Sequence, residues 1–202
     1  MMVLEKQAYT LDDLLAMGED AYVEIIDWEL VEMTAAGGVH QIISGNIFRI
    51  LDRYVNEKDI GIVMPDQMTY LMNSVTKGLK DSFVPDVSYI NRENVPKGWV
   101  IEKPHPGVPD LAVEIFSPGD NVEILLKKVE TYLEKGTIQI WIIYPKVKEL
   151  HQFTSEEPNK SRIYRGSETI DAKNLFPDIE GLTTDAIFHL PAWIISDDKA
   201  EE

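Results

Sequence analysis

Two acidic residues stand where buried strands normally carry apolar side chains. Glu114 lies near the end of PDLAVEIF, Pro109 to Phe116, which is otherwise almost entirely apolar. Asp86 follows Pro85 near the start of another apolar segment, FVPDVSYI. A buried carboxylate is costly unless it meets a cation or a metal ion. Two such acids at the ends of neighbouring strands would suit a hard divalent cation with oxygen ligands.

Each residue also has a purely structural interpretation. A Pro-Asp pair often marks the entry to a strand, where the Asp side chain closes a turn. An ion pair with Lys or Arg would neutralise Glu114 without any catalytic role. Lys128 stands at the edge of an apolar stripe on the next predicted helix. Its amine can therefore either reach solvent or point toward Glu114.

The elements around Glu114 predict how it is positioned. The strand at 109–116 is followed by a turn in which Asp120 is a candidate helix cap, and by a helix from about Asn121 to Lys135. Ile138 to Pro145 is a near-continuous apolar run, which is typical of a strand covered on both faces. This strand–helix–strand succession predicts a right-handed crossover between parallel strands.

Periodicity and turn residues predict the other elements. They are a short helix at Thr10–Gly18, a β-hairpin at Tyr22–Met33 that turns at Asp27-Trp28, an amphipathic helix at Val39–Val55, strands at Gly61–Pro65, Gln67–Leu71 and Phe83–Ile90, an exposed loop at Asn91–Pro109, and a strand at Lys148–Phe153 antiparallel to its predecessor. The fold class that follows is α/β (α+β), a mixed β-sheet flanked by helices with an N-terminal β-hairpin.

Length and composition set broader bounds. The 202 residues fit a single domain, with a core at about 10–190 and an acidic tail at 196–202. The chain has no cysteine, which excludes disulfides and thiolate metal sites. The start resembles no signal peptide, and no apolar run approaches the roughly 20 residues of a membrane span. We expect a cytoplasmic protein without a membrane partner.

Charge and motifs exclude several functions. The chain carries 35 Asp plus Glu against 19 Lys plus Arg, a net charge of −16, which argues against strong non-specific binding of nucleic acid. A local basic rim could still arise from Lys77, Lys80, Arg92, Lys97 and Lys103 on exposed loops. The chain has no G-x-S-x-G elbow and no phosphate loop of the G-x-x-x-x-G-K type. Its four histidines lack the paired spacing of a zinc site.

Several segments together resemble a known group of enzymes. A Pro-Asp pair followed by a distant acidic strand is similar to the PD-(D/E)XK nuclease superfamily, which places two acids and a lysine around Mg²⁺. YVEIIDWELVEM, His40, FVPDVSYI, PDLAVEIFSPGD, KKVETYLEKG and IQIWIIYP occur in this order. In that order they resemble a bacterial family of restriction-endonuclease-like proteins. The resemblance covers roughly Thr10 to Leu190.

The resemblance implies a metal site and its ligands. Asp86 and Glu114 match the metal-binding acids, and the carbonyl of Ile115 is a further candidate ligand for Mg²⁺ or Mn²⁺. The superfamily lysine two residues after the second acid is absent, because Phe116 occupies that place. Lys128 matches a lysine that has moved to the following helix, in the pattern K-x-x-x-Y.

Two further positions of this sequence match the family, and two others depart from it. Glu24 in the hairpin matches an additional acidic residue, which would be an outer metal ligand. His40 matches a recurring histidine that could contact the substrate phosphate, or could only cap or pack. Trp28 stands where the family's hairpin usually has Gly, and Ile124 stands where an Asp is common. Neither departure removes a proposed ligand.

The function expected from this resemblance is Mg²⁺-dependent hydrolysis of phosphodiester bonds in DNA. Asp86, Glu114, Lys128 and Glu24 would be the catalytic residues. A homodimer is expected, because double-strand cleavage needs two sites facing two strands. One alternative is a catalytically inactive nuclease fold that serves as a binding or regulatory module, which the net charge favours. Another is a hydrolase of RNA or of a small phosphoester.

Overall fold

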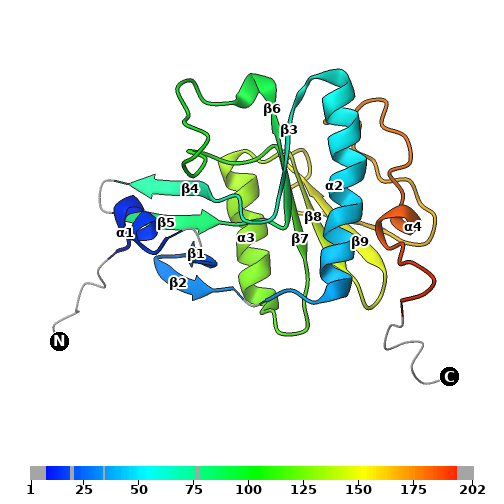
Figure 1. Cartoon of the computed structure of the whole chain (residues 1–202), viewed down its shortest axis with the longest axis horizontal. Helices are drawn as coiled ribbons and strands as arrows, with labels where there is room; N and C mark the ends of the chain where they lie inside the picture. The colour runs from blue at the N-terminus through cyan, green and yellow to red at the C-terminus, as the bar shows by residue number, and fades with distance from the viewer. Residues whose placement is uncertain (1–7, 19–20, 34, 76–77, 195–202) are drawn as a thin grey trace.

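The computed structural model describes residues 8–18, 21–33, 35–75 and 78–194 (Figure 1). The predicted acidic tail at 196–202 lies outside these residues, as does Lys77. Short elements flank the main body. They are α1 (Leu11–Ala16), the 3₁₀ helix η1 (Arg92–Asn94) and α4 (Thr184–Ile187). None of the helices among the described residues combines the length and apolar character that a membrane crossing requires.

The larger of two sheets is mixed, as predicted. Its strands lie in the order β10-β9-β8-β7-β6-β3. The pair β7–β8 is parallel, and the other neighbouring pairs are antiparallel. The crossover between β7 and β8 runs through α3, which confirms the predicted strand–helix–strand unit. The bounds are β3 Gly61–Pro65, β6 Val87–Asn91, β7 Leu111–Ile115, α3 Val122–Lys135, β8 Gln139–Tyr144, β9 Glu149–Thr154 and β10 Ser161–Tyr164.

Two hydrophobic clusters cover the two faces of this sheet. Helix α2 (Gly38–Lys58) packs on the face that receives Val113 and Ile115, and α3 packs on the face that receives Ala112. All five residues of β7 are buried, because helices cover both of its faces. Side chains alternate along a strand, so Glu114 shares the face of Ala112 and lies beneath α3. The strand thus carries its charge into the smaller of the two clusters.

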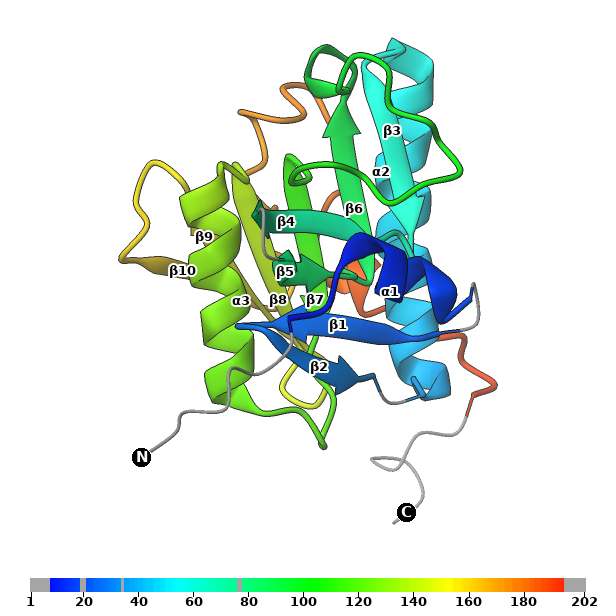
Figure 2. The same ribbon diagram turned by 90° about the vertical axis from the view of Figure 1, so that its left-hand side faces the viewer.

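The predicted hairpin belongs to a second sheet of its own. This sheet has the order β2-β1-β5-β4, and in Figure 2 its strands run across those of the larger sheet. Its bounds are β1 Val23–Ile26, β2 Glu29–Glu32, β4 Tyr70–Val75 and β5 Gly78–Phe83. The hairpin turns at Asp27 and Trp28, which have φ values of 51° and 71°. Positive φ at both turn residues matches the twist of the flanking strands, and an aspartate tolerates it better than a tryptophan does.

The predicted strand at Phe83–Ile90 is wrong in one respect, because two strands occupy its place. Strand β5 ends at Phe83 in the smaller sheet, and β6 begins at Val87 in the larger one. Pro85 and Asp86 form the link between the sheets rather than part of a strand. Pro85 has no N–H to donate, so a sheet ladder is readily interrupted there.

Helix ends show a second correction. The predicted cap Asp120 does not cap α3; its carboxylate instead accepts a hydrogen bond from the Ser117 N–H at 2.7 Å and closes the preceding turn. The side chain of Asn121 caps the helix by accepting from the Glu123 N–H at 2.8 Å. Asn and Asp are equally good helix caps, so residue type could not distinguish the two positions. Gly136 ends the helix with φ of 107°, as predicted.

The predicted loop at Asn91–Pro109 is not exposed throughout. His105 is 2% exposed and lies between the rings of Tyr70 and Trp99, with centroids 5.2 and 4.8 Å away. Its main-chain N–H donates to Thr69 at 2.8 Å and its carbonyl accepts from Leu71 at 2.9 Å. Neither ring nitrogen has a hydrogen-bond partner. The loop is therefore fastened at the start of β4 by main-chain hydrogen bonds and by the packed ring of His105.

We expect His105 to make stability depend on pH. Burial lowers the pKa of His105 below its ordinary value of 6.5, against weaker opposing effects of Gly107 and Asp110. Its contribution to the free energy of unfolding is therefore complete above pH 6.5 and is lost as the pH falls through its lowered pKa. Urea unfolding of the native chain and of His105→Phe, measured from about pH 5 to about pH 8, isolates this contribution as the difference between the two curves of unfolding free energy against pH. Parallel curves would contradict it.

Candidate active site

A buried ion pair joins β7 to α3. The Lys128 ammonium lies 2.8 Å from the Glu114 carboxylate, and the two residues are 5% and 7% exposed. The sequence left open whether this amine reaches solvent or the acid. The structure shows that it reaches the acid, because the face of α3 that carries Lys128 packs against the sheet. The lysine and one of the two candidate metal ligands therefore meet.

Glu24 joins the same ion pair from the other sheet. Its Oε1 accepts from the Lys128 ammonium at 2.8 Å and from the Val84 N–H at 2.7 Å. Glu24 lies on β1 and is 4% exposed, and Val84 lies in the link that precedes Asp86. The hairpin is therefore anchored to α3 and to the link by one carboxylate. A role for Glu24 as outer metal ligand stays a prediction.

Tyr132 completes the environment of Glu114, a role that was not predicted from the sequence. Its hydroxyl donates to Oε1 of Glu114 at 2.9 Å, and the side chain is fully buried against Phe83, with ring centroids 5.3 Å apart. Lys128 and Tyr132 stand one helical turn apart, so the K-x-x-x-Y spacing aims both donors at one acid. That spacing was the available signal.

Asp86 lies beside this cluster and is 6% exposed. Its N–H donates to the Val113 carbonyl at 3.0 Å, and its Oδ2 accepts from the Ile115 N–H at 2.6 Å. These two bonds hold Asp86 against the end of β7, next to Glu114. Its Oδ1 lies 3.2 Å from Nε2 of His40, in the first turn of α2. His40 therefore orients a candidate metal ligand.

The site holds more negative than positive charge. Three buried carboxylates, Glu24, Asp86 and Glu114, face one buried ammonium. Burial raises the pKa of Glu114 to about 8 even though Lys128 opposes the shift, and the charges of Glu24 and Asp86 add to it. Burial acts to lower the pKa of Lys128, but Glu114 and Glu24 outweigh it and raise that pKa. Lys128 is thus held in its charged form, and the acidic groups around it outnumber it.

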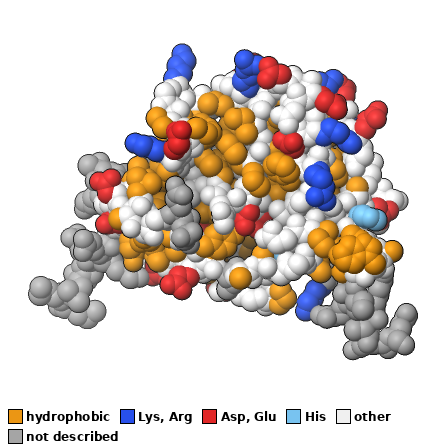
Figure 3. Space-filling model, viewed as in Figure 1, with side chains coloured by type: hydrophobic (Ala, Val, Ile, Leu, Met, Phe, Trp, Pro, Cys, Tyr) orange, Lys and Arg blue, Asp and Glu red, His pale blue; other side chains and the backbone are white. Residues whose placement is uncertain are grey.

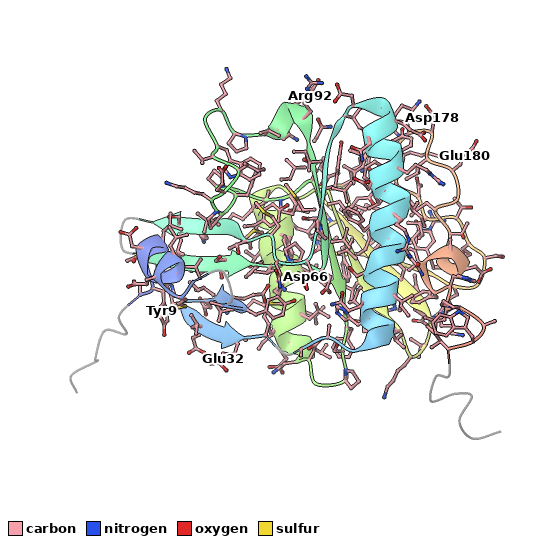
Figure 4. All side chains as sticks on the ribbon, viewed as in Figure 1. Tyr9, Glu32, Asp66, Arg92, Asp178 and Glu180 are labelled. Carbon is pink, nitrogen blue, oxygen red and sulfur yellow. The ribbon has the colours of Figure 1, made fainter. Side chains whose placement is uncertain are left out.

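His40 and a nearby pair extend the same electrostatic unit. Burial acts to lower the pKa of His40, but the hydrogen bond to Asp86 and the charges of Asp86, Asp66 and Asp120 raise it. Tyr22 donates its hydroxyl to both carboxylate oxygens of Asp66 at 2.8 Å. This pair was not predicted, because Tyr22 and Asp66 are distant in the chain and each is an ordinary polar residue by itself. In Figure 4, Asp66 lies near the centre of the molecule.

The site residues predicted from the sequence line one hollow with a volume of about 240 Å³. Asp86, Glu114, Lys128, Glu24 and His40 all border it, and so does Ile115. The site residues expected from the sequence are thus brought together. The expected basic rim is not found among the described residues, since neither Lys80, Arg92, Lys97 nor Lys103 borders the hollow. Lys80 instead lies 3.9 Å from both Asp27 and Asp81, and Arg92 pairs with Asp59.

The residues present fit a divalent cation with few protein ligands. In the described part of the chain, no three His, Asp or Glu side chains are arranged as a metal cage. A cation would therefore rest on Asp86 and Glu114, with the Ile115 carbonyl and water. Mg²⁺ commonly binds through one or two carboxylates and keeps several waters. Each oxygen of Asp86 has one protein partner, His40 or the Ile115 N–H, and so keeps a lone pair for a cation, and the excess negative charge favours a cation.

The fold and this arrangement of acids and lysine define a restriction-endonuclease-like protein. The model of the Uma2 family, described as "Putative restriction endonuclease", matches residues 9–185, and the chain belongs to this family. A solved structure described as "a putative nuclease belonging to DUF820", from Anabaena variabilis ATCC 29413, is similar with a TM-score of 0.73 and 18% identity. The match covers 89% of this chain and 97% of that one. None of the curated proteins matches.

We expect replacement of Lys128 to destabilise the protein strongly. Lys128→Met leaves Glu24 and Glu114 buried without their cation, which costs about 3–5 kcal/mol for a broken buried pair. Urea unfolding measures the loss. Adding Glu24→Gln and Glu114→Gln to the same chain removes the unpaired charges and should restore most of the stability.

The neighbouring lysine supplies the control. Lys127 pairs with Asp27 at 2.8 Å, but its side chain is 43% exposed. Lys127→Met should therefore cost at most about 1 kcal/mol. Equal losses from the two substitutions would contradict the burial argument.

Proposed function

We propose that this chain is a Mg²⁺-dependent endonuclease that hydrolyses phosphodiester bonds of DNA. Family membership and the similarity to a described nuclease support the nuclease class. The observation that carries the proposal is the position of the buried Lys128 ammonium, which lies against Glu114 in the hollow that Asp86 also borders. Mn²⁺ would serve in place of Mg²⁺, since both ions accept oxygen ligands.

The residues divide the work between metal binding and charge stabilisation. Asp86 and Glu114 would hold the cation, with the carbonyl of Ile115. When bound, the cation supplies a water of lowered pKa and stabilises charge on the phosphoryl oxygens. Lys128 would orient that water or neutralise the transition-state charge, for which its amine must come within about 3 Å of the reacting oxygen. Glu24 holds Lys128 in place from the other side.

The first turn of α2 supports binding of the substrate phosphate. The N-cap residue Gly37 gives no side-chain hydrogen bond to the helix. The first N–H groups of a helix are unpaired within it and attract anions. His40 lies in this turn and borders the hollow, and Asp86 raises its pKa together with Asp66 and Asp120. A phosphate oxygen between α2 and Lys128 would meet positive charge on both sides.

We expect Asp86→Asn to abolish most of the cleavage. The substitution keeps the shape of the side chain but removes a charged metal ligand, and loss of an electrostatic stabiliser of this kind costs about 10²–10³ in kcat. Cleavage of plasmid and oligonucleotide DNA is measured with Mg²⁺ or Mn²⁺. Asp59→Asn is the control, because Asp59 is an exposed acid that pairs with Arg92 away from the hollow.

The result of this cleavage assay also decides between a nuclease and the main alternative, a binding module. The net charge of −16 favours a nuclease fold kept only as a binding module. If the native chain and Asp86→Asn show the same activity under every metal condition, the nuclease proposal fails and the binding module is preferred. The proposal requires a homodimer only if both strands of a duplex are cut, because each strand then needs its own site.

A further inference from the structure

The reactive groups are buried beside a small hollow. Glu24, Asp86, Glu114 and Lys128 are each between 4% and 7% exposed. The hollow has a volume of about 240 Å³, which is below the roughly 300–1,000 Å³ of typical ligand sites. A scissile phosphate must enter this space to come within about 3 Å of the Lys128 amine. The reacting part of the substrate must therefore reach down to these buried groups.

One wall of the hollow is apolar. Ile26, Val31, Met33 and Ala36 border it from the hairpin and the segment that follows, and Ile124 and Leu125 border it from α3. Apolar side chains do not bind phosphate, but they suit the face of a base or a sugar. In a duplex each base is stacked and paired, so it cannot present its face to such a wall without leaving the stack.

The rim of the hollow carries negative charge. Glu32 and Asp120 border it and are exposed, whereas Lys128 and His40 are its only cationic residues in the described part of the chain. In Figure 3 the Lys and Arg side chains on this face lie mainly along its upper edge and beside α2. Duplex DNA carries one negative charge per roughly 1.7 Å of axis. The phosphates next to the scissile one would therefore meet carboxylates.

We infer that this site takes an unpaired DNA strand, with one nucleotide placed against the apolar wall, and does not take an intact duplex. The inference rests on the proposed function for its chemistry and names the substrate of that same site. An unpaired strand can bend so that its neighbouring phosphates turn away from Glu32 and Asp120. Its base is free to contact Met33 and Val31. A single cut of this kind needs one site, so it requires no homodimer.

The preference is tested first by binding, without metal and hence without cleavage. Fluorescence anisotropy compares one labelled oligonucleotide, free and annealed to its complement, with the native chain in EDTA. We expect at least about tenfold tighter binding of the unpaired strand. Few phosphates should contact the protein, so the log–log slope of affinity against salt should be near −1, about −0.7 for each phosphate of a single strand. Equal or tighter binding of the duplex overturns the inference.

Cleavage of the same two oligonucleotides with Mg²⁺ separates this inference from the proposed function. We expect kcat/KM for the unpaired strand to exceed that for the duplex at least about tenfold. Preferential binding of the unpaired strand with no cleavage of either supports the inference and removes the nuclease proposal. Cleavage of the duplex as fast as the unpaired strand overturns the inference and leaves the nuclease proposal intact.

Two substitutions test the wall and the rim separately. Met33→Ser should weaken binding of the unpaired strand several-fold, whereas Leu126→Ser should not, because Leu126 is an exposed apolar residue of α3 outside the hollow. Glu32→Lys should strengthen duplex binding and so reduce the preference for the unpaired strand over the duplex. Glu134→Lys makes the same charge change at an exposed position of α3 away from the hollow and should have a smaller effect. Equal effects of each substitution and its control overturn the inference.

Discussion

The buried Lys128 ammonium between Glu24 and Glu114 is the interaction on which the rest of this structure depends. Its two carboxylates come from different sheets, and the lysine comes from the helix that crosses between β7 and β8. A buried charge that loses its partner is strongly destabilising. The smaller sheet, α3 and the end of β7 must therefore keep their mutual positions for the charge to stay paired. The same geometry places the lysine at the hollow that Asp86 also borders.

Stability alone does not account for this arrangement. Well-packed apolar residues in place of a buried ion cluster are often equally stabilising or more so. Here Glu24 and Glu114 share one lysine, Asp86 borders the same hollow, and burial raises the pKa of Glu114 to about 8. Such an excess of charge is what a divalent cation would balance, and perturbed pKa values of this kind concentrate at functional sites. The Tyr132 hydroxyl holds Glu114 in place, and the Ile115 N–H holds Asp86 in place.

Much of the fold could be predicted because its signals are local. The parallel pair β7–β8 follows from apolar strands on both sides of a capped helix, and the hairpin follows from its strand composition around Asp27-Trp28. The division into two sheets could not be predicted in this way. Pro85 and Asp86 look like part of one strand, since apolar residues flank them on both sides. Only the competition between two sheets for hydrogen bonds decides that they form a link.

The sequence by itself determined the fold class, the family resemblance and the acids and lysine of the candidate site. Residue type and spacing suffice for these, since a charge in an apolar strand and a lysine on the next helix are visible in one dimension. Tertiary structure alone decided which groups touch. Glu24 and Lys128 are 104 residues apart, and Tyr132 gains its role only through the acid it faces. Charge pairing inside a protein is a property of distance and burial, which no local pattern specifies.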